Sequence, residues 1–168
     1  MAPSGRSTTG TGNPEEGELR PQLLDRFGLS VEVKTPDDLP SRIEVVRRRD
    51  EFERDTAAFI AKWAREETKL RKKIVSARDR LARVTVPDAA LERAARLCMT
   101  LGTDGLRGEL TLMRAARALA ALEGHKAVAD EQLRRIASPA LRHRLRRNPL
   151  DDAGSSVRVD RAISEVFG

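Results

Sequence analysis

The sequence has very few of the residues that build disulfides, metal clusters and aromatic surfaces. Among its 168 residues there is one cysteine, Cys98, and aromatic residues make up only 3%. A single cysteine excludes an internal disulfide and gives no metal-ligand cluster. The net charge of +6 is compatible with an anionic partner. However, the scarcity of aromatic side chains and the scattered acidic residues argue against a nucleic-acid binder.

Long apolar runs and nucleotide-binding loops are also missing. No stretch approaches the roughly 20 apolar residues that span a bilayer, and the first residues contain no apolar signal-peptide core. We therefore expect a soluble, cytoplasmic protein with no membrane partner. The sequence has no Gly-x-x-x-x-Gly-Lys-Ser/Thr run, the loop that cradles nucleotide phosphates. It also has no apolar strand ending in Asp-Glu that would hold Mg²⁺, since Asp37 and Asp38 lie in a proline-flanked loop.

What the sequence does have is charge and helical periodicity. Charged residues make up 35% of the chain, and the apolar residues are mostly Ala, Leu, Val and Ile, which favours a helical fold. Leu70, Ile74, Ala77 and Leu81 form one narrow apolar stripe on an otherwise charged segment, typical of a connecting helix with one buried seam. Interspersed charges of this kind usually form a solvated face.

Local signals place the ends of the helices. Ser41 is predicted to cap a helix as part of a capping box with Glu44, and Asp55 to cap the next one. Gly102 and Asp104 are predicted to end one helix and cap the following one. We expect the remaining helices over residues 88–101, 105–123, 129–145 and 157–167. Cys98 lies on an apolar helix face and is predicted to be a core residue.

The most distinctive stretch runs from Gly10 to Phe27. Its first part, Thr-Gly-Asn-Pro-Glu-Glu-Gly, is a turn-rich loop that contains Asn13. Pro21 suits the first turn of a short helix that ends near Arg26, and residues 29–34 alternate apolar and polar like a short strand. An amide and an arginine therefore lie on a loop and a helix beside a strand, where an α/β sheet presents a ligand.

This stretch, TGNPEEG followed by LRPQLLDRFG, closely resembles the AAA+ ATPase (I) subunit of magnesium chelatase, and so does LGTDGLRGELTL at 101–112. The resemblance covers roughly residues 10–166 but only the C-terminal part of such a subunit. It implies a mainly α fold: a remnant of an AAA+ α/β domain (loop, short helix, strand), then a linker helix and a helical lid bundle. The implied division is 1–9 disordered, 10–35 remnant of the α/β core, 36–86 connecting helices and 87–168 lid.

The resemblance also implies roles for three residues. Asn13 falls on the sensor-1 position, Arg26 on the arginine finger that reaches the nucleotide of the neighbouring subunit, and Arg107 on the sensor-2 position that contacts ATP phosphates. The alternatives are structural: Asn13 as a turn residue, Arg26 paired with Asp25 or Glu32, and Arg107 paired with Asp104 or Glu109. The roles of Arg20, Arg114 and the basic cluster from Arg142 to Arg147 stay open.

By the same resemblance, the chain would be part of a ring-forming ATPase that drives Mg²⁺ insertion into protoporphyrin IX in chlorophyll or bacteriochlorophyll synthesis. ATP and Mg²⁺ would be its cofactors. Identical subunits and the D and H subunits of the chelatase would be its partners, with no resident metal site. Because the phosphate cradle is missing, the chain by itself is not expected to hydrolyse ATP. A non-catalytic module that docks on a chelatase ring is the alternative, and a cobalt chelatase is another.

Overall fold

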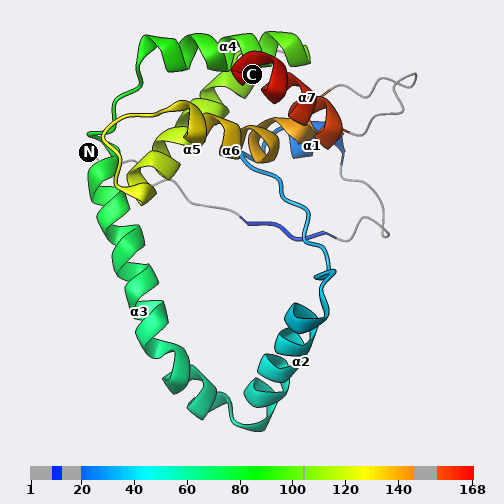
Figure 1. Ribbon diagram of the computed structural model, residues 1–168, viewed down its shortest axis with the longest axis vertical. Coiled ribbons are helices and arrows are strands. Elements are labelled where there is room, and N and C mark those ends of the chain that lie inside the picture. The colour runs from blue at the N-terminus through cyan, green and yellow to red at the C-terminus, as the bar shows by residue number, and fades with distance from the viewer. Residues whose placement is uncertain (1–8, 13–19, 104, 146–154) are drawn as a thin grey trace.

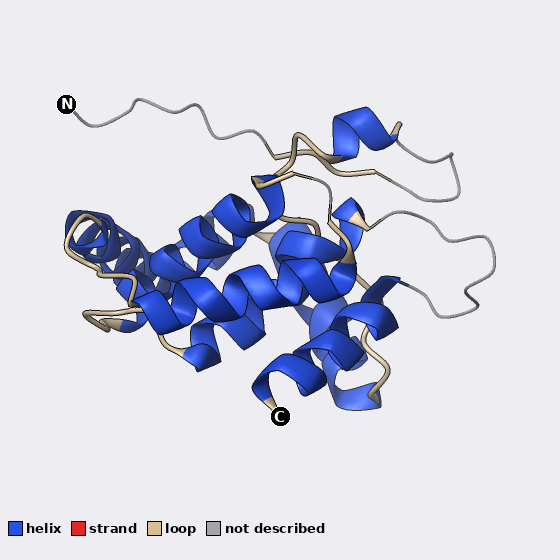
Figure 2. Ribbon diagram, turned by 90° about the horizontal axis from the view of Figure 1, so that it is seen from above, coloured by secondary structure: helices blue, strands red, loops and turns tan. Residues whose placement is uncertain are grey.

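The computed structural model describes residues 9–12, 20–103, 105–145 and 155–168 of the chain. These parts are helices and connecting loops, and Figure 2 draws no strand among them. The predicted mainly α fold class is therefore confirmed. The elements are α1 (Pro21–Leu24), α2 (Leu39–Arg54), α3 (Thr56–Leu81), α4 (Asp88–Leu101), α5 (Arg107–Glu123), α6 (Asp130–Leu141), the 3₁₀ turn η2 (Arg142–Arg144) and α7 (Ser155–Phe167).

Helices α4 to α7, here called the bundle, pack together and enclose the apolar core (Figure 1). Its largest fully buried apolar side chains are Leu97, Leu112, Leu133, Leu141 and Val159. Each contributes about 1.5–3 kcal/mol of burial free energy, so α5, α6 and α7 are held mainly by packing. Cys98 belongs to this core at 1% exposure, as predicted.

Helices α2 and α3, here called the arm, extend away from the bundle (Figure 1). No residue of α2 is buried, and Ala77 is the one buried residue of α3. The two helices meet at Asp55 and contact each other near that end through Phe52 and Phe59, whose ring centroids are 5.6 Å apart. At its other end α3 joins the bundle, where Arg80 donates to the carbonyl of Ala121 at 3.0 Å.

Side chains at the helix ends explain where the arm helices begin. Asp55 accepts a hydrogen bond from the backbone N–H of Ala58 at 2.9 Å, which confirms the predicted cap of α3. The predicted cap at Ser41 is wrong. Asp38 is the cap instead, and its carboxylate accepts from the backbone N–H of Ser41 at 2.8 Å. The helix begins earlier because Pro40 fits the first turn, where no N–H is needed.

The sequence predicted some ends of the bundle helices correctly and others not. Gly102 ends α4 with a φ of 64°, in the left-handed region that favours glycine. Asp104, the predicted cap of the next helix, lies outside the described residues, and α5 begins at Arg107. The helix predicted to reach Leu145 stops at Leu141 and continues as the tighter turn η2.

The strand predicted over residues 29–34 does not form in the described structure. Strands need a neighbour for their backbone hydrogen bonds, and none of the described segments runs beside this one as a strand. Val31 and Val33 are 69% and 93% exposed. The segment is instead fixed at one point, where the N–H of Ser30 donates to the carbonyl of Pro139 at 2.8 Å. The disorder predicted for residues 1–9 falls almost wholly outside the described residues.

Among the described helices, none combines the length and the apolar character needed to cross a membrane.

Candidate functional site

Asp25 fixes the turn after α1 to two distant parts of the bundle. Its carboxylate forms one ion pair with Arg107, at the start of α5, and another with Arg144, in η2. These contacts span 82 and 119 positions of the sequence, respectively. The short α1 helix therefore lies where the start of α5 and the end of α6 meet.

Arg144 is the most buried charged group at this junction, with its side chain 5% exposed. Besides the carboxylate of Asp25, its guanidinium donates to the backbone carbonyls of Asp25 at 2.8 Å, Phe27 at 2.7 Å and Ala140 at 3.1 Å. A guanidinium presents five donors in a rigid fork, which suits such a set of acceptors. Sequence reasoning left Arg144 within an unassigned basic cluster; its position between the buried residues Leu141 and Leu145 was the one available signal.

His143 strengthens the same contact. Its Nε2 lies 3.0 Å from the carbonyl oxygen of Phe27, so this nitrogen carries the proton and donates it. Burial is the main cause that lowers the pKa of His143 below its usual 6.5, and the neighbouring Arg144 and Arg142 act in the same direction. Arg142 adds a longer ion pair of 3.7 Å to Glu32. Two consecutive side chains thus hold one carbonyl of the segment that follows α1.

Arg26, the predicted arginine finger, lies on the turn after α1 and is exposed. Its backbone N–H donates to the carbonyl of Leu23 at 3.1 Å, which closes the turn. The structural alternative, pairing with Asp25 or Glu32, does not occur. Asp25 pairs with Arg107 and Arg144, and Glu32 pairs with Arg142. Within the described residues, its guanidinium has no hydrogen bond or ion pair.

Arg107, the predicted sensor-2 residue, is 59% exposed in its side chain. Its partner is Asp25, whereas the sequence alternatives were Glu109 and Asp104. The structure therefore places Arg107 beside the turn that carries Arg26. The predicted sensor-1 residue, Asn13, lies outside the described residues.

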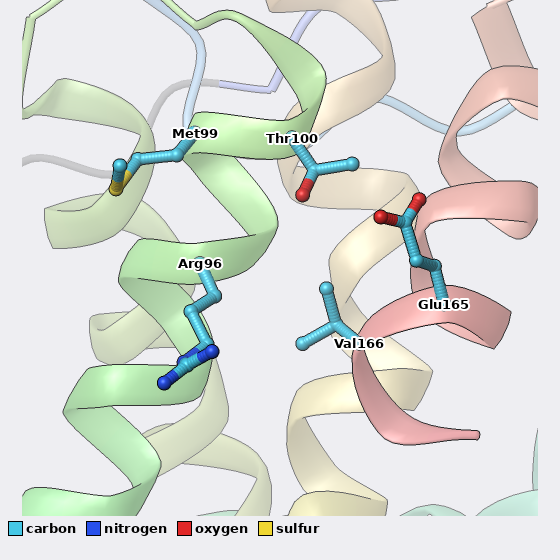
Figure 3. Close-up of a pocket in the computed structure, with 5 residues that line it drawn as sticks. All are labelled: Arg96, Met99, Thr100, Glu165 and Val166. Atoms are coloured by element: carbon cyan, nitrogen blue, oxygen red, sulfur yellow. The ribbon is translucent and has the colours of Figure 1, made fainter.

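The described residues form neither a metal site nor a pocket at the predicted site residues. No group of three or more His, Cys, Asp or Glu side chains is arranged to hold a metal ion there. A shallow hollow of about 280 Å³ lies between α4 and α7 (Figure 3), but no predicted site residue lines it. Its walls come from Arg96, Met99, Thr100, Glu165 and Val166.

Comparison with known proteins agrees with the motifs. The AAA lid domain family matches residues 91–165, which are most of the bundle. The chain is 63% identical over 158 residues to the magnesium-chelatase 38 kDa subunit of Acidiphilium rubrum, covering 94% of this chain and 46% of that protein. It is 58% identical to the subunit of the same name from Rhodobacter capsulatus, with 94% and 45% covered. It is 42% identical to the magnesium-chelatase subunit ChlI of Anabaena variabilis, with 95% and 47% covered.

Residues 91–165 are therefore similar to the AAA lid domain family, and the chain spans about half the length of the curated relatives it matches. The resemblance seen in the two sequence motifs is confirmed.

Proposed function

We propose that this chain is part of a chelatase AAA+ subunit and that it supplies the arginine-finger and lid half of a ring ATPase. The ring would couple ATP hydrolysis to the insertion of Mg²⁺ into protoporphyrin IX. The observation that carries this proposal is the pairing of Asp25 with Arg107 and Arg144. It holds the turn after α1 in place and leaves Arg26 without a partner among the described residues. In this proposal residues 10–35 belong to the α/β core, 36–86 connect and 87–168 form the lid.

Arg26 would act on a nucleotide held by a neighbouring subunit. An arginine finger stabilises the charge that develops on the transferred phosphoryl group, and it must be positioned before the reaction. The contacts of Asp25 and Phe27 with Arg144 supply that positioning. The exposed guanidinium of Arg26 has no competing carboxylate among the described residues, so a phosphate would not need to displace one.

Arg107 would bind phosphate in a different way, because it already has an anionic partner. A phosphate that reaches Arg107 must replace or share the carboxylate of Asp25. Since Asp25 also pairs with Arg144, such an exchange would alter the contacts between the turn after α1 and η2. Arg107 is thus suited to report nucleotide state to the lid, which is the sensor-2 role. Asn13 would orient the attacking water as sensor 1.

This chain can supply only part of a nucleotide-binding site. Arg26 and Arg107 offer guanidinium donors for phosphate oxygens, but the sequence contains no Gly-Lys pair from which a phosphate cradle is built. The phosphate cradle and the Mg²⁺ ligands would come from the rest of the assembly. Identical or related ring subunits and the D and H subunits of the chelatase are the partners this proposal requires.

The test is complementation. The 168-residue chain is mixed with the part of the Rhodobacter capsulatus 38 kDa subunit that it does not cover, and ATP hydrolysis is measured. We expect hydrolysis in the mixture and none with either piece alone. A mixture that assembles, as shown by co-elution, but does not hydrolyse ATP would contradict the proposal.

A second candidate function is that of a binding module. The chain would then be a non-catalytic module that docks on a complete chelatase ring. Titrating it into an intact ring of the relative separates the two functions: loss of ring activity in proportion to added chain, with no activity in the complementation mixture, would support the docking module. A cobalt-chelatase subunit is the remaining alternative, and metal insertion assays with Mg²⁺ and Co²⁺ distinguish it.

A further inference from the structure

Gly108 lies where three parts of the bundle meet. It is the second residue of α5, directly after Arg107, and it is buried. A β-carbon at this position would lie 3.2 Å from the hydroxyl oxygen of Thr103 and 3.4 Å from both the sulfur of Cys98 and the Cδ2 of Leu141. These neighbours belong to the turn before α5, to α4 and to the end of α6. Glycine at position 108 therefore lets the first turn of α5 approach all three closely.

The three neighbours of Gly108 have little room to move away. Cys98 and Leu141 are 1% and 0% exposed, so other core side chains enclose them. Thr103 is held by the carbonyl of Cys98, to which its backbone N–H donates at 3.1 Å and its hydroxyl at 3.3 Å. Because protein interiors are close-packed, an added methyl group displaces the backbone or the surrounding side chains. A methyl group at Gly108 would therefore push the start of α5 away from α4 and α6.

The two arginines that bind Asp25 come from the two helices that meet at Gly108. Arg107 precedes Gly108 on α5, and Arg144 follows Leu141, the last residue of α6, by three positions. Both guanidinium groups pair with the carboxylate of Asp25. One carboxylate can bind two arginines only while the segments that carry them stay close together. The close approach of Gly108 to Leu141 therefore helps to set the distance between the two arginines.

We propose that Gly108 is a positioning residue that keeps Arg107 within reach of Asp25. It does so by fixing the distance between the start of α5 and η2. When α5 is displaced, Arg107 loses Asp25 first, because it is 59% exposed and Asp25 is its one side-chain partner among the described residues. Arg144 is 5% exposed and also donates to three backbone carbonyls. The link to nucleotide rests on the proposed function, in which a phosphate competes with Asp25 for Arg107.

The first test follows the urea midpoint of the full 168-residue chain. Alanine in place of glycine usually stabilises a helix, so a lower midpoint for Gly108→Ala would come from the close contacts of the new methyl group. Gly28→Ala is the matched control, because a β-carbon there would lie 4.0 Å from the Cγ2 of Thr111, an ordinary contact distance. We expect Gly108→Ala to lower the midpoint and Gly28→Ala to leave it unchanged or raise it.

Combined variants separate positioning from stability alone. Arg107→Ala should lower the urea midpoint of the wild type but not that of Gly108→Ala, in which the ion pair with Asp25 is already broken. Arg144→Ala should lower the midpoint in both backgrounds. In NMR spectra of the arginine side chains, Gly108→Ala should shift the Nε signal of Arg107 more than that of Arg144. Adding Cys98→Ala, which removes one of the three close atoms, should return the Arg107 signal toward its wild-type position.

Nucleotide binding gives a separate readout. In the complementation mixture, Gly108→Ala should change the affinity for labelled ATP in the same direction as Arg107→Ala, and the combined variant should equal Arg107→Ala alone. The urea and NMR measurements use the chain by itself, so they decide the role of Gly108 even if the proposed function fails. An unmoved Arg107 signal in Gly108→Ala would overturn the proposal. So would an Arg107→Ala change that costs as much stability in Gly108→Ala as in the wild type.

Discussion

Asp25 and Arg107 form an ion pair across 82 positions of the sequence, between the turn after α1 and the first residue of α5. The same carboxylate also binds Arg144. Arg26 follows Asp25 directly in the chain, so the two arginines proposed to meet phosphate are linked through one acidic residue. A change at Asp25 would therefore act on the position of both.

The two arginines bound to Asp25 should differ sharply in their contribution to stability. Arg144 is 5% exposed and also holds three backbone carbonyls, whereas Arg107 is 59% exposed. Arg144→Ala would leave these partly buried carbonyl oxygens and the carboxylate of Asp25 without their donor. We therefore expect it to lower the free energy of unfolding by about 2–4 kcal/mol. Arg107→Ala should lower it by less than about 1 kcal/mol.

Urea unfolding measures this difference, with Arg114→Ala as an exposed control on α5. Hydrogen exchange at the N–H of Ser30, which donates to Pro139, reports whether the segment after α1 leaves the bundle. Faster exchange in Arg144→Ala than in Arg107→Ala is expected. Equal losses of stability would mean that the carbonyl contacts of Arg144 contribute little.

Arg26→Ala should abolish catalysis without unfolding the chain. Since the side chain has no partner among the described residues, its removal should leave the urea midpoint unchanged. In the complementation mixture we expect the rate of ATP hydrolysis to fall by about 10³–10⁵, the usual contribution of an arginine finger. Nucleotide binding, measured by fluorescence of a labelled ATP, should persist. Normal hydrolysis by a co-eluting Arg26→Ala mixture would refute this role.

The parts of the fold that depend on local signals could be predicted from the sequence. Helix α4 runs from Asp88 to Leu101 and ends at Gly102, as periodicity and the terminal glycine predicted. Asp55 caps α3 for the same kind of local reason, a carboxylate two or three residues before free N–H groups.

Contacts between residues far apart in the sequence could not be predicted from their sequence neighbours. Nothing near Asp25 or Arg144 in the sequence indicates a pairing over 119 positions, and each had a plausible local interpretation. The strand predicted over 29–34 failed for a related reason, because alternation describes a segment suited to a sheet but does not provide its neighbour. The roles of Asn13, Arg26 and Arg107 rest on motif resemblance and stay predictions.

Stability should depend on pH through His143. Its pKa in the folded chain lies below the usual 6.5, mainly because of burial. Between these two values the unfolded state binds more protons than the folded state, so the free energy of unfolding decreases as the pH falls through this window. The stabilisation is complete above the unfolded pKa. Asp38, Glu44 and Glu123, whose pKa values are lowered from their usual ones, act at more acidic pH.

Urea midpoints at mildly acidic and neutral pH, compared for the wild type and His143→Gln, check this dependence. The variant should be less sensitive to pH because glutamine has no proton to bind, while its amide can still donate to the carbonyl of Phe27. His125→Gln, at an exposed position, is the matched control. An unchanged pH dependence in His143→Gln would show that other groups cause it.

Cys98 should be unreactive until the bundle opens. Its thiol is 1% exposed, and burial, reinforced by Glu109, raises its pKa to about 11. Since the thiolate is the reactive form, a disulfide reagent at neutral pH should modify the native chain far more slowly than free glutathione. Leu112→Ala, which empties part of the same core, should lose about 2–5 kcal/mol. If labelling of Cys98 requires global unfolding, Leu112→Ala should be labelled faster than the wild type by the factor that corresponds to this loss of stability. Rapid labelling of the wild type would mean instead that α4 and α5 separate locally.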